Sequence, residues 1–331
     1  MPTNLPPEAA EAEKRYKAAT TVPEKIERLE EFMSLIPKHK GTDKLRAGLR
    51  KRLSKLREQA QAGKKKGGGA RGVDAAWRVE REGSGQVALI GPPNTGKSAL
   101  LAALTKATPE VAAYPWTTRV PAPGMMFYEN VQIQLLDTPP LTREHLEPEL
   151  IDLIRRADAV LLTVDLQADA LGQLEEAVEL LAERKIVPAG RRPEEPERGV
   201  VYPPFLVLVN KCDDEGGDGD FEVFRELSGG DWSLQPVSAV AGRNLDMLRR
   251  RVYEILGIMR VYSKPPGKKA DLNSPFTLDI GSTVEEFAAT VHRDLQQQLK
   301  SARVWGTGVH DGQTVSRDHV LHEGDVVEVR V

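Results

Sequence analysis

A glycine-rich turn that follows a short apolar run restricts the fold of this chain more than any other feature. Residues 87–90 read Val-Ala-Leu-Ile, and the segment Gly91–Ser98, GPPNTGKS, comes directly after them. The pattern Gly-x-x-x-x-Gly-Lys-Ser between a strand and a helix is typical of a phosphate-binding loop, in which backbone N–H groups and a helix N-terminus face the anion. We expect Lys97 to reach the phosphates and the Ser98 hydroxyl to bind Mg²⁺. The alternative is an ordinary strand-to-helix turn that contains glycine.

Apolar runs alternate with helical segments beyond this turn. The expected strands are residues 87–90, 131–136, 159–164 and 205–209. The expected helices are residues 98–106, 149–156, 171–183 and 245–258. Continuous apolar strands between helices predict an α/β domain with a doubly wound, mainly parallel sheet that helices cover on both faces. We assign residues 85–260 to this domain.

The regions on either side have a different character. Residues 1–62 form a basic region in which leucines and other apolar residues recur at helical spacing, so we expect a helical hairpin there. The stripes are Ile26, Leu29, Met33 and Ile36, then Leu45, Leu49, Leu53 and Leu56. Residues 63–84 begin with glycines and lysines and read as a flexible basic linker. A second linker is expected at 261–274 and a compact α+β domain at 275–331, with a capping box at residues 282–285.

Charge is distributed unevenly along the chain. The formal net charge is −3, yet residues 38–71 carry 13 Lys or Arg against two acidic residues, a local charge of +11. Such asymmetry indicates an anionic partner, and RNA fits better than a membrane because no apolar run is long enough to span one. A solvated helix face beside a charged linker explains the same charges equally well. With one cysteine, Cys212, and no secretory signal pattern, we expect a cytoplasmic protein.

A second motif selects the base. Asn210-Lys211-Cys212-Asp213 follows the apolar run 205–209. The Asp213 carboxylate suits the two adjacent donors of guanine, N1–H and the exocyclic amine, whereas adenine offers no matching pair. The stem of Lys211 would cover the base plane, and backbone N–H groups of Ser238-Ala239 would meet the guanine carbonyl. Cys212 reads as a small buried residue.

Two further segments complete the candidate site. Asp137 follows the run 131–136 at a place where a carboxylate would hold Mg²⁺ through water, although a plain surface turn has the same appearance. The stretch 114–119, YPWTTR, offers Thr117 and Thr118, one of which would complete the Mg²⁺ shell and sense the terminal phosphate. The residues expected to contact the nucleotide are Gly91, Pro92, Pro93, Asn94, Thr95, Gly96, Lys97, Ser98, Ala99, Asp137, Asn210, Lys211, Asp213, Ser238 and Ala239.

Together these segments resemble the five motifs of translation-factor-class GTPases, and specifically the developmentally regulated GTP-binding (DRG) proteins of the Obg superfamily. The resemblance runs along the whole chain: residues 38–58 are similar to the basic helical region of that family. Residues 275–331 are similar to its TGS domain, a ubiquitin-like β-grasp. It implies a GTPase that binds GTP or GDP with Mg²⁺ and associates with ribosomes or structured RNA. A protein partner would use the TGS domain or the N-terminal helices, and neither a membrane nor a DNA sequence is an expected partner.

The chain departs from that family at the third motif. The usual Asp-x-x-Gly ends here in Pro140, which has no N–H to offer the γ-phosphate. Leu141 stands where many GTPases place a Gln that orients the attacking water. The span 165–204 is also too short for the extra domain that DRG proteins insert, so the chain resembles a shorter, prokaryotic relative.

These departures leave the function open between two hypotheses. The first is a slow, Mg²⁺-dependent switch that hydrolyses GTP to GDP and phosphate, with Lys97, Asn94 and Thr117 or Thr118 as the catalytic residues. Asn94 is similar to an Asn that binds K⁺ at this place of the loop in several relatives, and this resemblance implies K⁺-stimulated hydrolysis. The alternative is that the Asn94 side chain bonds to its own backbone. The second hypothesis is a nucleotide-holding adaptor for RNA or ribosomes with negligible turnover. A third, an ATP-using enzyme, is opposed by Asp213.

Overall fold

The computed structural model describes Leu29, Phe32, Met33, Leu35, Leu49 and residues 77–105, 120–144 and 146–331. It divides into two units, Met1–Arg78 and Val79–Val331. In the first unit Leu29, Phe32, Met33, Leu35 and Leu49 are helical, and Leu29, Phe32, Leu49 and Trp77 are buried. The rest of the predicted helical hairpin lies outside the described residues.

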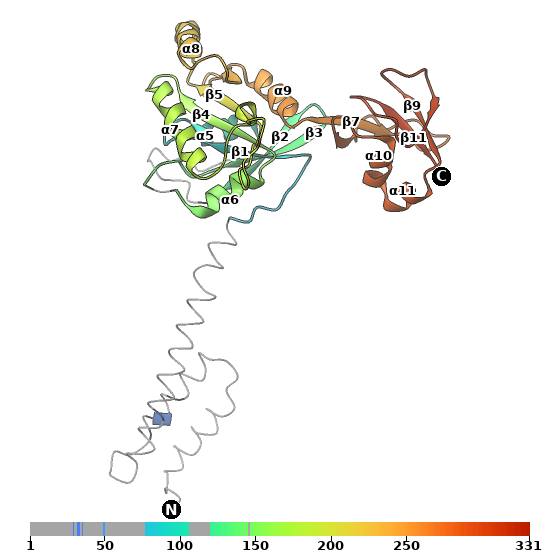
Figure 1. The fold of residues 1–331 in the computed structure, drawn as a ribbon, viewed down its shortest axis with the longest axis horizontal. Coiled ribbons are helices and arrows are strands. Elements are labelled where there is room, and N and C mark those ends of the chain that lie inside the picture. Colours follow the sequence, from blue (N-terminus) through green and yellow to red (C-terminus); the bar gives the residue numbers. More distant parts are fainter. Residues whose placement is uncertain are drawn as a thin grey trace, which may run out of the picture. The chain divides into compact units, whose positions relative to one another are not determined.

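The α/β domain has a six-stranded sheet in the order β2-β3-β1-β4-β5-β6. All neighbouring pairs are parallel except β2 and β3. The strands are β1 (Gln86–Ile90), β2 (Ala122–Tyr128), β3 (Val131–Asp137), β4 (Ala159–Asp165), β5 (Phe205–Asn210) and β6 (Leu234–Pro236). The helices are α5 (Lys97–Leu104), α6 (Pro148–Arg156), α7 (Ala170–Glu183), α8 (Glu215–Leu227) and α9 (Leu245–Ile255). Figure 1 shows the helices around this sheet, and the predicted doubly wound arrangement is confirmed.

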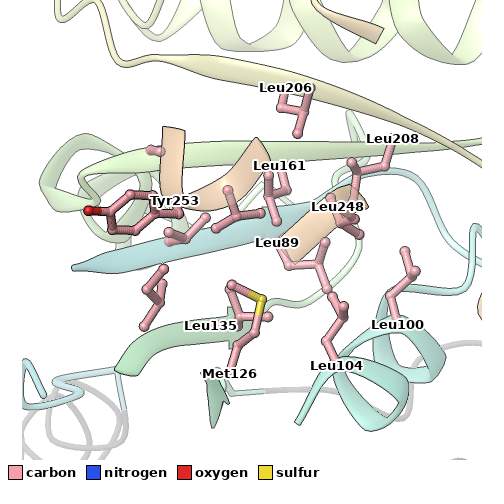
Figure 2. Close-up of a cluster of buried hydrophobic side chains, with 14 of the residues drawn as sticks. Leu89, Leu100, Leu104, Met126, Leu135, Leu161, Leu206, Leu208, Leu248 and Tyr253 are labelled. Carbon is pink, nitrogen blue, oxygen red and sulfur yellow. The ribbon is translucent and has the colours of Figure 1, made fainter. Parts of the chain in front are cut away.

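The core of this domain follows from the strand pattern. Alternate residues of β1, such as Val87 and Leu89, pack against Leu100 and Leu104 of α5 and Leu248 of α9 (Figure 2). The residues between them, such as Ala88, are just as buried because α7 contacts β4 on the opposite face. Burial on both faces explains why these strands read as continuous apolar runs.

The C-terminal domain is a five-stranded sheet in the order β10-β9-β11-β7-β8. Its strands are β7 (Ile258–Ser263), β8 (Phe276–Asp279), β9 (Ser301–Trp305), β10 (Gln313–Val315) and β11 (Val326–Arg330), and its helices are α10 (Val284–Val291) and α11 (Arg293–Gln298). β11 runs parallel to β7 and antiparallel to β9. Phe287 and Ala288 of α10 pack on Val261, Val304 and Val327 of the sheet. A helix laid on a mixed sheet with parallel central strands is the expected β-grasp.

Three local expectations differ from the structure. The linker predicted at 261–274 overlaps β7, which pairs with both β8 and β11, so the β-grasp sheet begins at Ile258. In the linker predicted at 63–84, residues near its end pack on the α/β domain: the Ser84 N–H donates to Gln132 O, and Gly83 bridges Ile133. The capping box lies one residue later than predicted, between Thr283 and Glu286.

The expected strands and helices also do not include β2 and α8. β2 is an edge strand that pairs with β3 along its whole length, but proline and glycine near its start weaken the strand pattern. Helix α8 begins with the glycine-rich acidic segment EGGDGD, and the Asp214 carboxylate accepts from the Gly217 N–H to start it. Weak helix formers hold the helical conformation here because Phe221 and Phe224 are buried against the domain.

Candidate nucleotide site

Parallel strands bring the predicted motifs to one edge of the sheet. The register pairs Leu89 of β1 with Asp137 of β3, and Asp165 of β4 with Asn210 of β5. The loop Gly91–Ser98 leaves β1 at the same edge and enters α5. The carboxyl ends of such strands are where ligands bind in open α/β sheets.

The backbone of the Gly91–Ser98 loop needs its glycines. Gly91 has φ +147°, and a Cβ there would lie 2.3 Å from the Thr163 carbonyl oxygen. Gly96 has φ +88°, and a Cβ there would lie 2.3 Å from Asn210 Nδ2. Asn94 adopts φ +63° with an exposed side chain, a conformation that Asn tolerates better than most residues. The loop is therefore built around close backbone approaches that side chains would block.

Lys97 lies folded back over this loop. Its Nζ donates to the carbonyls of Gly91 at 2.9 Å and Pro92 at 2.8 Å. Burial lowers the pKa of Lys97 to about 8, an effect that the nearby Asp137 partly offsets. A buried ammonium that donates to two carbonyls and lies close to one carboxylate is well placed to gain from an incoming phosphate. Pro92, Pro93 and Ala99 are partly exposed around it.

Ser98 and Asp137 are brought together as predicted. The Ser98 hydroxyl donates to Asp137 Oδ2 over 2.5 Å, and Asp137 is 1% exposed. A hydroxyl and a carboxylate side by side form a hard oxygen donor set, which is the kind Mg²⁺ prefers. The two side chains therefore fit a magnesium ion bound beside the phosphates. Of the other predicted contributors to that ion, Thr117 and Thr118 lie outside the described residues.

Hydrogen bonds tie the third motif, which begins at Asp137, to the end of β1 and to the phosphate-binding loop. The Thr138 hydroxyl donates to Leu89 O over 2.9 Å, and the N–H of Leu141 donates to Gly91 O over 3.0 Å. Leu141 is 3% exposed. Pro140 thus offers no donor, and the next N–H along the chain is already bonded to the phosphate-binding loop.

Asn210 joins the phosphate-binding loop to the base-binding segments. Its Nδ2 donates to Thr95 O over 2.8 Å, and its Oδ1 accepts from the Ala239 N–H over 3.2 Å. The Ser238 N–H donates to Arg243 O over 3.2 Å. Both N–H groups predicted to meet a guanine carbonyl therefore have protein partners in this structure.

The Asp213 carboxylate is bonded on both oxygens. The Ser238 hydroxyl donates to Oδ1 over 2.5 Å, and Gln167 Nε2 donates to Oδ2 over 3.2 Å. Lys211 has φ +66° and an ion pair between Nζ and Asp165 Oδ2 at 2.5 Å. Sequence reasoning missed Asp165 and Gln167, although Asp165 ends an apolar strand just as Asp137 does.

Arg243 holds the backbone on either side of Asp213, and Cys212 is buried next to it. Arg243 Nη1 donates to the carbonyls of Cys212 at 3.0 Å and Asp214 at 2.6 Å, and Nη2 pairs with Asp218. Burial, with the hydrogen bond to Asp218 as the next cause, raises the pKa of the Cys212 thiol to about 11. The thiol is therefore neutral at ordinary pH, as expected for a packing residue.

Two features are absent from the described residues. No cluster of three or more His, Cys, Asp or Glu side chains suited to a metal occurs in that part of the chain. No helix within the same residues is both long and apolar enough to cross a bilayer.

Known proteins are similar to this chain over most of its length. Residues 86–191 match the family described as 50S ribosome-binding GTPase, and residues 259–331 match the TGS domain. A GTP-binding protein of Methanocaldococcus jannaschii is 32% identical over 93% of this chain and 92% of its own length. Developmentally-regulated G-protein 3 of Arabidopsis thaliana is 29% identical over 94% of this chain and 99% of its own.

A solved structure supports the fold. The Schizosaccharomyces pombe YchF GTPase superposes with a TM-score of 0.53, covering 76% of this chain and 99% of that chain at 14% identity. At this level of identity the likeness concerns the fold alone.

Proposed function

Because the chain belongs to the YchF/Obg-type superfamily of GTPases that carry a TGS domain, we propose that it is a DRG-type switch. In this proposal it binds GTP with Mg²⁺ at Gly91–Ser98 and hydrolyses it slowly to GDP and phosphate. The switch would act on ribosomes or ribosomal RNA, and hence in the cytoplasm.

The bridge made by Asn210 carries the proposal. One buried amide holds the loop expected to bind phosphates and the segment expected to bind the base at a fixed spacing. Asp213 lies beside that bridge with both carboxylate oxygens already oriented by donors. A carboxylate held in this way matches the paired donors of guanine, whereas adenine offers no such pair. The expected result is that GDP competes for the site and ADP does not.

Hydrolysis would rest on few groups. Lys97 would supply positive charge to the β- and γ-phosphates once it leaves the carbonyls of Gly91 and Pro92. When bound, Mg²⁺ would neutralise phosphate charge beside Ser98 and Asp137. Leu141 is apolar and buried, so it orients no water, and Pro140 donates nothing. These features support a low intrinsic rate.

Asn94 supplies a test of ion dependence. It is exposed and has a left-handed backbone conformation within the loop expected to bind the phosphates, so its side chain has room to turn toward a monovalent ion there. We propose that K⁺ accelerates hydrolysis through Asn94. Turnover should be faster in K⁺ than in Na⁺ buffer, and Asn94→Ala should remove that difference. Equal turnover of the unaltered protein in the two buffers would reject the idea.

The ribosome is the partner that the family description favours. The test is co-sedimentation of the full chain with ribosomes in the presence of GDP or a non-hydrolysable GTP analogue. Binding that depends on the nucleotide supports a switch. No sedimentation in either state would reject the ribosome as partner.

A nucleotide-holding adaptor is the second candidate, and the bonded third motif favours it. With the Leu141 N–H on Gly91 O, the described part of that motif has little freedom to respond to a γ-phosphate. Single-turnover hydrolysis with and without ribosomes separates the two. Release of γ-phosphate in either condition supports the switch, whereas release in neither supports the adaptor.

A further inference from the structure

We infer that Gln167 is a positioning residue for base specificity, because its side-chain amide fixes the plane of the Asp213 carboxylate that guanine requires. The inference rests on the proposed guanine site and assigns a role to a residue in the loop between β4 and α7.

The first step is the bonding of the carboxylate itself. Ser238 holds Asp213 Oδ1, and Gln167 Nε2 holds Oδ2. The two donors come from different loops, so together they oppose rotation of the carboxylate group. Ser238 alone would leave it free to turn about the bond to Cβ.

The second step is that Gln167 reaches two targets with one nitrogen. Nε2 also donates to the Lys211 carbonyl oxygen, again at 3.2 Å. The Asp165 ion pair holds the ammonium end of the same lysine. Lys211 has a positive φ, which a side-chain-bearing residue keeps only when its surroundings hold it there. Gln167 therefore stabilises the strained residue two positions before Asp213 as well as Asp213 itself.

The third step is that Gln167 is itself held in place. Its backbone N–H donates to Asp165 Oδ1 over 3.0 Å, and Asp165 is only 8% exposed. The Asp165 N–H in turn donates to Gln173 Oε1 of α7 over 2.9 Å. The loop is thus fixed to β4 and α7 before any ligand arrives.

The chemical consequence separates guanine from hypoxanthine. Guanine presents N1–H and the exocyclic amine, and both reach one carboxylate only if its two oxygens lie in the plane of the base. Hypoxanthine lacks the amine and makes a single contact, which tolerates a rotated carboxylate. Loss of the Gln167 amide should therefore weaken GDP more than inosine diphosphate. A residue that merely supports the fold would weaken both equally.

The experiment measures the affinities of GDP and inosine diphosphate for the full chain and for Gln167→Ala. We expect GDP binding to weaken by about fivefold, the effect of one lost hydrogen bond, and inosine diphosphate binding by clearly less. Gln167→Glu places a second carboxylate beside Asp213 and should lower the GDP affinity, relative to that of inosine diphosphate, further still. Gln132→Ala and Gln132→Glu, at an exposed position on β3, are matched controls that should leave both affinities unchanged.

The outcomes are distinguishable. A GDP-to-inosine-diphosphate affinity ratio that falls in both Gln167 variants supports the inference. An unchanged ratio overturns it, whether both affinities drop together or neither moves, and leaves the proposed function intact. If the unaltered chain binds ADP as well as GDP, the guanine site itself is wrong, and the inference falls with it.

Discussion

Asn210 donates its side-chain amide to the Thr95 carbonyl while it accepts from the Ala239 N–H, so one residue spans the two halves of the candidate site. Asn210→Ala removes both bonds at a position 2% exposed and leaves the Thr95 carbonyl short of a donor. We expect a loss of about 2 kcal/mol in the free energy of unfolding together with weaker GDP binding. Denaturant titration and GDP titration check this. The control Asn273→Ala, on an exposed loop, should change neither.

Asp213→Asn tests the choice of base. The substitution replaces one accepting oxygen by a donor amide, so one guanine donor loses its partner and meets another donor. GDP affinity should fall by about 2 kcal/mol, roughly thirtyfold, while the fold is retained. Fluorescent-GDP titration with thermal unfolding measures both. An unchanged GDP affinity would show that guanine is not read by Asp213.

Pro140→Gly restores a backbone N–H at the position where related motifs contact the γ-phosphate. We expect the affinity for a non-hydrolysable GTP analogue to rise relative to GDP by about fivefold, which corresponds to one added hydrogen bond. Pro139→Gly is the matched control, since it adds the same flexibility and an N–H one residue earlier. A similar gain in both variants would assign the effect to flexibility rather than to the donor.

The low pKa of Lys97 makes nucleotide binding depend on pH. Phosphate requires the charged amine, and the free protein loses that proton near pH 8. Affinity for GDP should be flat below pH 8 and fall by up to about tenfold per unit above it. Calorimetry in two buffers of different ionisation enthalpy should show proton uptake on binding at pH 8.5. Lys97→Met should abolish that uptake.

The same pKa sets the sign of a stability change. The folded chain releases the Lys97 proton near pH 8, whereas the ordinary pKa of a lysine is 10.5. Between these values the unfolded state binds more protons, so the Lys97 contribution favours folding increasingly as pH rises. The unfolding free energy of Lys97→Met should lack this rise.

Elements that follow a local sequence pattern were predictable from the sequence. The apolar strands β1, β3, β4 and β5 and the loop between β1 and α5 follow from periodicity and from the glycine, lysine and serine spacing. The side chains that orient the base-binding residues were not predictable. Asp165 and Gln167 act on Lys211 and Asp213, more than forty positions away in sequence. Contacts of this kind depend on which strands become neighbours, and no local pattern encodes that.

The C-terminal boundary was missed for a related reason. Residues 258–263 alternate too weakly to identify a strand, yet they form one because β8 and β11 pair with them on both sides. Tertiary pairing overrides the weak local signal. The Tyr253 hydroxyl and Arg260 also share the Glu323 carboxylate, so helix α9 is bonded to the domain that the sequence separated from it by a linker.

The pairing of β7 with β11 bears on how the chain matures during its synthesis. β11 fills the gap between β7 and β9, yet it follows both of them in the chain and is synthesised after them. While Val326–Arg330 are still inside the exit tunnel, β7 and β9 each present an unpaired edge, a state prone to wrong pairing. All strands of the α/β domain are synthesised before β11, so the sheet of that domain does not depend on it. A stalled or shortened chain would therefore present a finished nucleotide-binding unit attached to an unfinished sheet.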